Sequence, residues 1–281
     1  MSAFDPLRDK GEQPAGRLDA IFSRGRKVVI AYLCIGDPSV EESIALGRAC
    51  IRAGADVLEL GVPFSDPTAD GPAIARASHR AISHGGGLKA SLLAAREIRA
   101  SNPNVGLVLF GYYNPIFVRG EARAAREAAE GGIDALLVVD LPVEESAPLC
   151  AAASSCGIGI VPLLAPTSRA ERVRAAAEVS KHCPTPFVYY VSVTGVTGSR
   201  VDDAGDAGLR AADLSKQLGR PVVVGFGIDS RDKAKAAAMH ASGIVVGTAL
   251  VRAIEQRATA GERQSEVERI IRELRAGVDE A

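Results

Sequence analysis

Two carboxylic acids, Glu59 and Asp70, are the residues best placed in this sequence for acid–base chemistry. Glu59 lies inside the apolar run Val57–Leu60, and side chains alternate between the two faces of a strand. If Leu58 and Leu60 face a covering layer of helices, Glu59 faces the opposite side. A carboxyl group there loses most of its water, which raises its pKa and lets it carry a proton near neutral pH.

Asp70 has a different setting, directly before Gly71 and Pro72. Because proline favours the first turn of a helix, we expect a helix to begin there. The free amides and the dipole of that helix would keep the Asp70 carboxylate ionised. Two carboxyl groups whose pKa values are pushed apart can serve as an acid and a base. Two plainer interpretations stay open: a buried Glu59 paired with an arginine, and Asp70 as a helix cap only.

Three glycine-rich segments follow predicted strands and predict a phosphate site. Glycine lets the backbone approach an anion closely, and a helix beginning at such a loop points its amides at the anion. We expect Thr248 to cap such a helix. The polar stretch from Thr194 to about Ala207 has the length of a mobile lid. The segments are TGVTGS (194–199), GFGI (225–228) and GTAL (247–250).

Several chemistries lack candidate residues. None of the seven lysines and none of the four histidines lies at the carboxyl end of a predicted strand. A Schiff-base aldolase therefore has no candidate lysine, and a metal-dependent epimerase or aldolase has no evident ligand set. We accordingly expect no metal in this chain. Proton transfer by carboxylates remains.

The elements that would position these residues alternate along the chain as short apolar runs and alanine-rich helical stretches. Eight such units without an intervening linker predict one (β/α)₈ barrel, although a doubly wound sheet has the same periodicity. In a barrel the active site lies at the carboxyl ends of the strands. Capping boxes at Ser39/Glu42, Ser168/Glu171 and Ser265/Glu268 mark expected helix starts. The expected strands are Val28–Cys34, Val57–Leu60, Val105–Phe110, Ala135–Val139, Ile158–Leu164, Phe187–Val191, Val222–Val224 and Ile244–Val246.

Composition fits one soluble α/β domain. The 281 residues are 47% hydrophobic and 24% charged, with a net charge of -1, so nothing indicates nucleic acid or an acidic membrane surface. The five cysteines show no CxxC spacing, which is typical of reduced thiols in a cytoplasmic protein. We expect residues 1–16 to be a flexible, disordered extension. We expect residues 17–281 to be the α/β barrel, beginning with a short N-terminal helix.

With these residues in view, the chain resembles the tryptophan synthase alpha subunit family, a family of TIM barrels. The most specific match is LELGVPFSDP (58–67), followed by ADGP (69–72). The resemblance runs from about Arg17 to about Val278. Further matching segments are GDP (36–38), YNP (113–115), DLPVEE (140–145), YYVS (189–192), TGVTG (194–198), GFGI (225–228) and VG (246–247).

The resemblance implies retro-aldol cleavage of indole-3-glycerol phosphate to indole and glyceraldehyde 3-phosphate. Glu59 would move protons between the indole C3 and the glycerol hydroxyl, and Asp70 would accept a hydrogen bond from the indole N–H. Tyr189 would place the substrate, and Tyr32 and Leu137 would line the indole pocket. The phosphate would be held by Gly198, Gly227, Gly247 and Thr248.

The resemblance also implies a partner, a pyridoxal-phosphate beta subunit that takes up the indole in an alpha2-beta2 heterotetramer. Loops around Asp66 and Asn114 would contact it, and the alpha chain itself would hold no cofactor. The chain departs from the family pattern at Cys34, Thr68, Phe110, Gly111 and Thr248. Thr248 keeps a hydroxyl group, whereas Cys34, Phe110 and Gly111 bear on the fit of the indole or on coupling to the partner.

Three other functions stay open. A free-standing lyase would perform the same reaction without a partner. A non-catalytic barrel would bind a phosphorylated ligand and regulate another protein. A phosphosugar isomerase would use the same fold without making indole.

Overall fold

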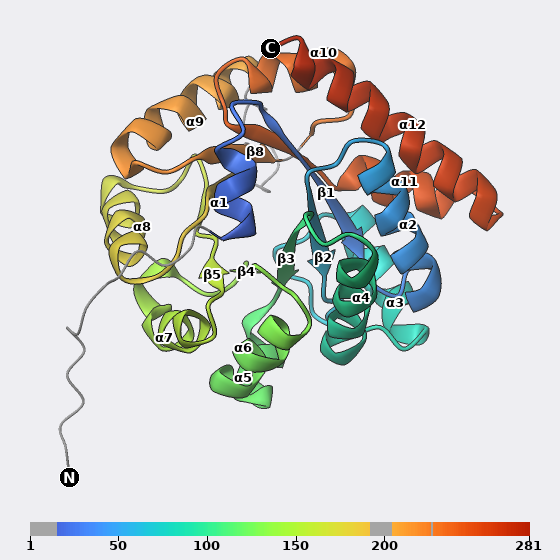
Figure 1. Ribbon diagram of the computed structural model, residues 1–281, viewed down its shortest axis with the longest axis horizontal. Coiled ribbons are helices and arrows are strands. Elements are labelled where there is room, and N and C mark those ends of the chain that lie inside the picture. Colours follow the sequence, from blue (N-terminus) through green and yellow to red (C-terminus); the bar gives the residue numbers. More distant parts are fainter. Residues whose placement is uncertain (1–15, 192–203, 226) are drawn as a thin grey trace.

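The computed structural model describes residues 16–191, 204–225 and 227–281. Its described helices surround a central sheet (Figure 1). The short N-terminal helix expected from the sequence is present as α1 (Arg17–Phe22). Apart from Gly16, the expected extension lies outside the described residues. So does most of the expected lid, whose last part is helical because α9 begins at Ala204.

Nine parallel strands form one sheet in the order β5-β4-β3-β2-β1-β9-β8-β7-β6. The two end strands are pieces of one predicted strand, divided where Pro162 lacks a backbone N–H. Across the division, the Val161 N–H donates to the Leu136 carbonyl at 2.9 Å, and the Pro162 carbonyl accepts from the Tyr189 N–H at 2.9 Å. The sheet thus closes through the chain, as a barrel and not as an open doubly wound sheet. The strands are β1 (Val28–Cys34), β2 (Val57–Gly61), β3 (Gly106–Gly111), β4 (Ala135–Val138), β5 (Gly159–Ile160), β6 (Leu163–Leu164), β7 (Val188–Val191), β8 (Val222–Gly225) and β9 (Gly243–Val246).

The helices form the outer layer and connect the strands. A 3-10 turn at Val143–Glu145 precedes α7. After α1 the helices are α2 (Val40–Arg52), α3 (Pro72–Ser83), α4 (Leu88–Ser101), α5 (Tyr113–Arg119), α6 (Glu121–Glu130), α7 (Ala147–Ser155), α8 (Ala170–His182), α9 (Ala204–Leu218), α10 (Arg231–Ala238), α11 (Thr248–Gln256) and α12 (Ala260–Asp279).

Helix starts were only partly predictable from capping residues. Ser39 caps α2 as expected, with its Oγ accepting from the Glu42 N–H at 3.1 Å. The expected start at Ser168 is wrong, because its Oγ accepts from the Ala165 N–H at 3.0 Å and the helix follows Arg169. The start at Ser265 is also wrong. Thr259 forms a complete capping box six residues earlier, so the first-turn amides of α12 are already satisfied there.

Burial along β2 gives the direction of each of its side chains. Leu58 and Leu60 belong to the apolar cluster that includes residues of the surrounding helices. Val57 belongs to a second cluster, made mainly of strand residues such as Val108 and Val223, inside the barrel. Because side chains alternate along a strand, Glu59 lies on the interior side with Val57.

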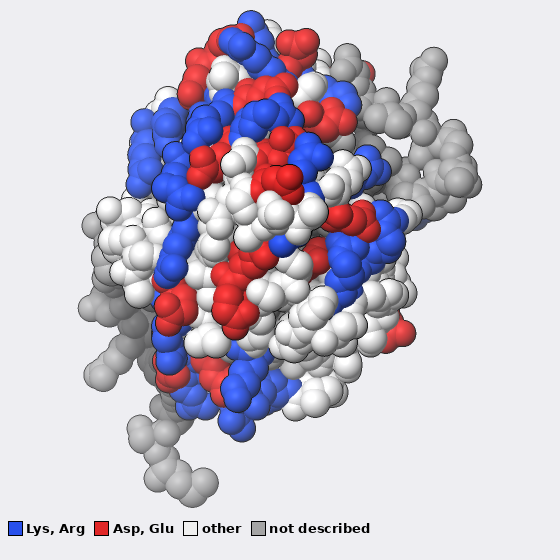
Figure 2. Space-filling model, turned by 90° about the vertical axis from the view of Figure 1, so that its right-hand side faces the viewer, with Lys and Arg blue, Asp and Glu red and all other residues white. Residues whose placement is uncertain are grey.

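The surface carries charges of both signs. On the face drawn in Figure 2, lysine and arginine side chains are interleaved with aspartate and glutamate. This mixture agrees with the net charge of -1. Among the described residues, none of the helices has the length and apolar character needed to cross a bilayer.

Candidate active site

Glu59 lines a cavity of about 230 Å³ at the carboxyl ends of the strands. Its side chain is almost fully buried, with 1% of the residue exposed. Its Oε1 has no hydrogen-bond partner, and no described arginine pairs with it. Burial raises the pKa of Glu59 to about 8. The carboxyl group therefore carries a proton at neutral pH, as the sequence predicts, and the buried arginine partner considered above is absent from the described residues.

This burial predicts that Glu59→Gln is more stable than the wild type at neutral and higher pH. The folded-state pKa of about 8 lies above the ordinary value of 4.5. Stability contributed by the protonated form is therefore present below pH 4.5 and is lost as the pH rises through 8. A neutral glutamine has no such loss. The melting temperature of the variant should exceed that of the wild type by an amount that grows between pH 5 and 8.

Glu130→Gln is the matched control, because Glu130 lies at an exposed position at the end of α6. The difference in melting temperature between Glu130→Gln and the wild type is expected to stay constant between pH 5 and 8. A constant difference for Glu59→Gln as well would contradict a pKa raised by burial.

Asp70 lies on the loop between β2 and α3 and is bound by a tyrosine. The Tyr112 hydroxyl donates to Asp70 Oδ2 at 2.9 Å and accepts from the Ala69 N–H at 3.0 Å. Burial raises the pKa of Asp70, and the hydrogen bond from Tyr112 opposes this. The sequence predicted that Asp70 is held by the start of α3, whereas the contact that the structure shows is with Tyr112. Gly71 occupies the N-cap position of α3, so the Asp70 side chain does not cap the helix.

Tyr112 is a functional candidate that the sequence reasoning missed. It directly follows β3 and is buried, with its ring stacked on Phe64 at a centroid distance of 5.0 Å. This stacking fixes the hydroxyl that binds Asp70. Its position directly after a predicted strand could have identified it, because side chains at strand ends surround the active site of a barrel.

Aromatic side chains form the walls of the cavity around Glu59. Tyr32 is the neighbour of Glu59 across the β1–β2 pairing, and Tyr189 comes from β7. Burial raises the pKa of Tyr189, and so do the charges of Glu59 and Asp70. Phe110 also lines the cavity, with its ring edge-on to Tyr32 at 5.1 Å. Tyr32, Phe110 and Tyr189 therefore line the same cavity as Glu59.

Leu137 is the exception among the expected pocket residues. It is fully buried inside the barrel, in the cluster with Val108 and Phe187, and does not line the cavity. Its neighbour across the β3–β4 pairing is Phe110, which does line the cavity. The departure at position 110 thus bears directly on ligand fit.

Glycines and the start of α11 also line this cavity. Gly227, with a φ of +73°, lines it together with Gly247 and Thr248. The N-cap residue of α11 is Gly247, and no side chain caps this helix. The expectation that Thr248 caps it is therefore wrong, since Thr248 is its first helical residue. Uncapped first-turn amides can bind an anion. Gly198, the remaining expected phosphate residue, lies outside the described residues.

Arg252 is a second candidate that the sequence reasoning missed. It lines the cavity one helical turn after Thr248 and forms no ion pair or hydrogen bond with a described residue. An unpaired guanidinium beside uncapped amides favours an anionic ligand group. Its spacing of four residues from Thr248 could have identified it, because residues four apart lie on the same face of a helix.

The chemistry that the cavity supports is proton transfer on an anionic ligand. Glu59 supplies a neutral carboxylic acid to the lining, and Thr248 and Arg252 supply helix amides and a cation. Asp70 does not line the cavity, but its charge acts on Tyr32 and Tyr189, which do. Within the described ranges, no group of three histidine, cysteine, aspartate or glutamate side chains is arranged to hold a metal ion.

Comparisons with known proteins agree with this geometry. The family profile described as tryptophan synthase alpha chain matches residues 18–279. Tryptophan synthase alpha chains from Citrifermentans bemidjiense and from Geobacter sp. strain M21 are each 45% identical over 240 residues, covering 85% of this chain and 88% of theirs.

Solved structures give the same result. The tryptophan synthase alpha subunit of Legionella pneumophila is 30% identical, covers 95% of this chain and 99% of its own, and superposes with a TM-score of 0.84. A Mycobacterium tuberculosis tryptophan synthase chain is 33% identical, covers 94% of this chain and 99% of its own, and has a TM-score of 0.81. The chain therefore belongs to the tryptophan synthase alpha chain family, lyases that cleave indole-3-glycerol phosphate in tryptophan biosynthesis.

Proposed function

We propose that Glu59 and Asp70 carry out the retro-aldol cleavage of indole-3-glycerol phosphate in this cavity. The observation that carries the proposal is the buried, unpaired Glu59 carboxyl, with a pKa of about 8, in the same cavity as the uncapped start of α11. A proton donor and an anion site are thus combined in one space.

The chemistry begins with Glu59 protonated. Glu59 donates its proton to C3 of the indole, and positive charge develops on the ring nitrogen. Asp70 accepts a hydrogen bond from the N–H and stabilises that charge. The Glu59 carboxylate then takes the proton from the hydroxyl next to the scissile bond. The C–C electron pair returns to the ring, which yields indole and an aldehyde, and Glu59 ends protonated again.

The remaining residues bind and orient the substrate. Gly227, Gly247 and Thr248 hold the phosphate, together with Gly198. Arg252 adds a positive charge at the same end. Tyr32, Phe110 and Tyr189 enclose the indole, since their rings line the cavity beside Glu59.

The proposed partner is a pyridoxal-phosphate beta subunit, in an alpha2-beta2 assembly in the cytoplasm. Residues 17–281 serve as one catalytic domain without a cofactor of their own. Asp66 and Asn114, the expected contact positions, are both exposed. Close to Asn114, Phe117 and Val118 are 64% and 77% exposed. Large apolar side chains exposed together favour a protein contact.

The test is the release of indole from indole-3-glycerol phosphate, with and without a tryptophan synthase beta subunit. We expect the isolated chain to form indole, and the beta subunit to raise its turnover by about tenfold or more, a coupling of ~1.4 kcal/mol. An unchanged rate would indicate a free-standing lyase. No indole in either assay would favour the regulatory barrel or the phosphosugar isomerase.

A further inference from the structure

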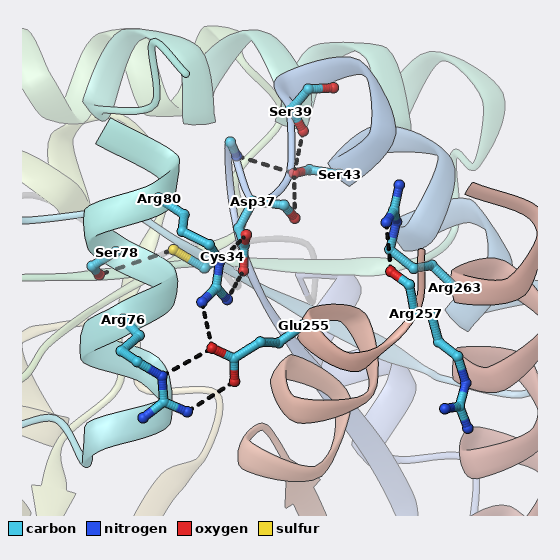
Figure 3. Close-up of polar contacts among 11 residues, drawn as sticks. Cys34, Asp37, Ser39, Ser43, Arg76, Ser78, Arg80, Glu255, Arg257 and Arg263 are labelled. Carbon is cyan, nitrogen blue, oxygen red and sulfur yellow. Dashed lines mark hydrogen bonds and ion pairs between the residues drawn. The ribbon is translucent and has the colours of Figure 1, made fainter. Parts of the chain in front are cut away.

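Glu255 joins two helices that form neighbouring walls of the cavity. It lies near the end of α11, and its carboxylate contacts two arginines of α3 (Figure 3). Arg76 donates through Nε to Oε1 at 2.9 Å and through Nη2 to Oε2 at 2.8 Å. Arg80 donates through Nη1 to Oε1 at 2.7 Å. The hydrogen bond from Arg76 is the main cause that lowers the pKa of Glu255 to about 2, so this carboxylate is ionised at assay pH.

Arg80 extends the same network to the loop after β1. Its Nε and Nη2 donate to the two carboxylate oxygens of Asp37, at 2.9 and 2.7 Å. Asp37 is buried, with 4% of the residue exposed. Figure 3 shows Arg80 between Asp37 and Glu255. A planar guanidinium bound on both sides fixes geometry better than a single ion pair does.

Both helices contribute to the proposed active site with residues nearer their starts. α3 begins two residues after Asp70 and lines the cavity through Ile74. α11 begins at Thr248 and lines the cavity through Thr248 and Arg252. The relative placement of the two helices therefore sets where the phosphate end lies with respect to Asp70.

The apolar contacts between the two helices include small side chains. The buried cluster at this place includes Ala77 and Ala81 of α3 and Val251 of α11. Alanine side chains are small, so few apolar atoms resist a shift of one helix along the other. The charged groups at Glu255 are the directional contacts that oppose such a shift.

We propose that Glu255 is a positioning residue that, by pairing with Arg76 and Arg80, holds the start of α11 at the distance from α3 that phosphate binding needs. The proposal rests on the proposed function, because it assigns the phosphate group to the start of α11. Glu255 does not line the cavity, so it acts only through the helices.

The test compares Glu255→Gln with the wild type in two assays. In the first, KM for indole-3-glycerol phosphate should rise about fivefold with kcat within twofold, because phosphate contacts contribute equally to ground-state and transition-state binding. In the second, titration calorimetry with glycerol 3-phosphate, which carries the phosphate but no indole, should show a similar rise in Kd.

Glu268→Gln is the matched control. Glu268 of α12 also bridges two arginines, Arg52 of α2 and Arg272, and its side chain is 19% exposed against 27% for Glu255. It does not line the cavity and does not join its walls. Both variants should lower the melting temperature by similar amounts, and only Glu255→Gln should change KM and Kd. Equal KM and Kd values in all three proteins would reduce Glu255 to a structural role and overturn the proposal.

A double-mutant cycle with Arg76→Gln separates pairing from other causes. If pairing is the cause, adding Arg76→Gln to Glu255→Gln should change Kd by less than twofold. If the two substitutions multiply their separate effects on Kd, the proposal is contradicted. If Glu255→Gln does not fold, Arg76→Gln alone is compared with the wild type in the same two assays. Failure of the proposed function is a separate outcome, which would be seen as wild-type turnover in Glu59→Gln. The Kd for glycerol 3-phosphate can still be interpreted in that case, because its measurement does not depend on turnover.

Discussion

Glu59→Gln is expected to lower kcat for indole formation by about 10²–10⁴-fold, the usual contribution of a positioned general acid and base. Glutamine has nearly the same shape as glutamic acid, and Glu59 makes no hydrogen bond at Oε1 that the change would break. KM for indole-3-glycerol phosphate should therefore stay within a few-fold of wild type. Steady-state assays of indole release measure both quantities.

The pH profile of the wild type checks the same assignment. Glu59 must be protonated to donate to the indole C3, and its pKa is about 8. The value of kcat/KM should thus be high below pH 8 and fall above it, because the free enzyme then loses the required proton. A profile that instead rises through pH 8 would mean that Glu59 must be ionised first. Wild-type turnover in Glu59→Gln would remove Glu59 from the chemistry altogether.

The direction of Glu59 could be predicted because it depends on local alternation alone. Leu58 and Leu60 pack toward the helices, so the side chain between them has only the barrel interior to enter. Its raised pKa follows from burial without any specific partner. The eight repeated units favoured a barrel over a doubly wound sheet, and the structure decides between them through the long-range pairings beside Val161 and Pro162.

The contact made by the Asp70 side chain could not be predicted, because it depends on where α3 starts to within one residue. Gly71, and not Asp70, takes the cap position, and this leaves the carboxyl to Tyr112. That hydrogen bond joins loops 42 residues apart in the chain. Thr248 illustrates the same limit, because Gly247 is the N-cap residue of α11.

Long-range pairings are a further limit. The contact of Glu255 with Arg76 spans 179 residues, and a sequence pattern holds no information on that separation. The place of Leu137 was missed for a related reason. Leu137 lies in the interior cluster, and its neighbour across the β3–β4 pairing, Phe110, lines the cavity in its place.

Gly225→Ala is expected to lower kcat/KM by about 10²-fold, the loss typical when a substrate-positioning group moves by about 1 Å. Gly225 is the last residue of β8, and a Cβ atom built there would overlap the Tyr189 hydroxyl. The Tyr189 ring forms a wall beside Glu59, so it can escape the overlap only by changing the shape of the cavity. Gly261→Ala is the matched control, because its Cβ meets open space within α12, and it should keep wild-type kinetics with slightly higher stability. Wild-type kcat/KM in a folded Gly225→Ala protein would show that the position of the Tyr189 ring does not matter for the reaction. A loss confined to Gly225→Ala would instead mean that the small residue at the end of β8 exists to make room for that ring.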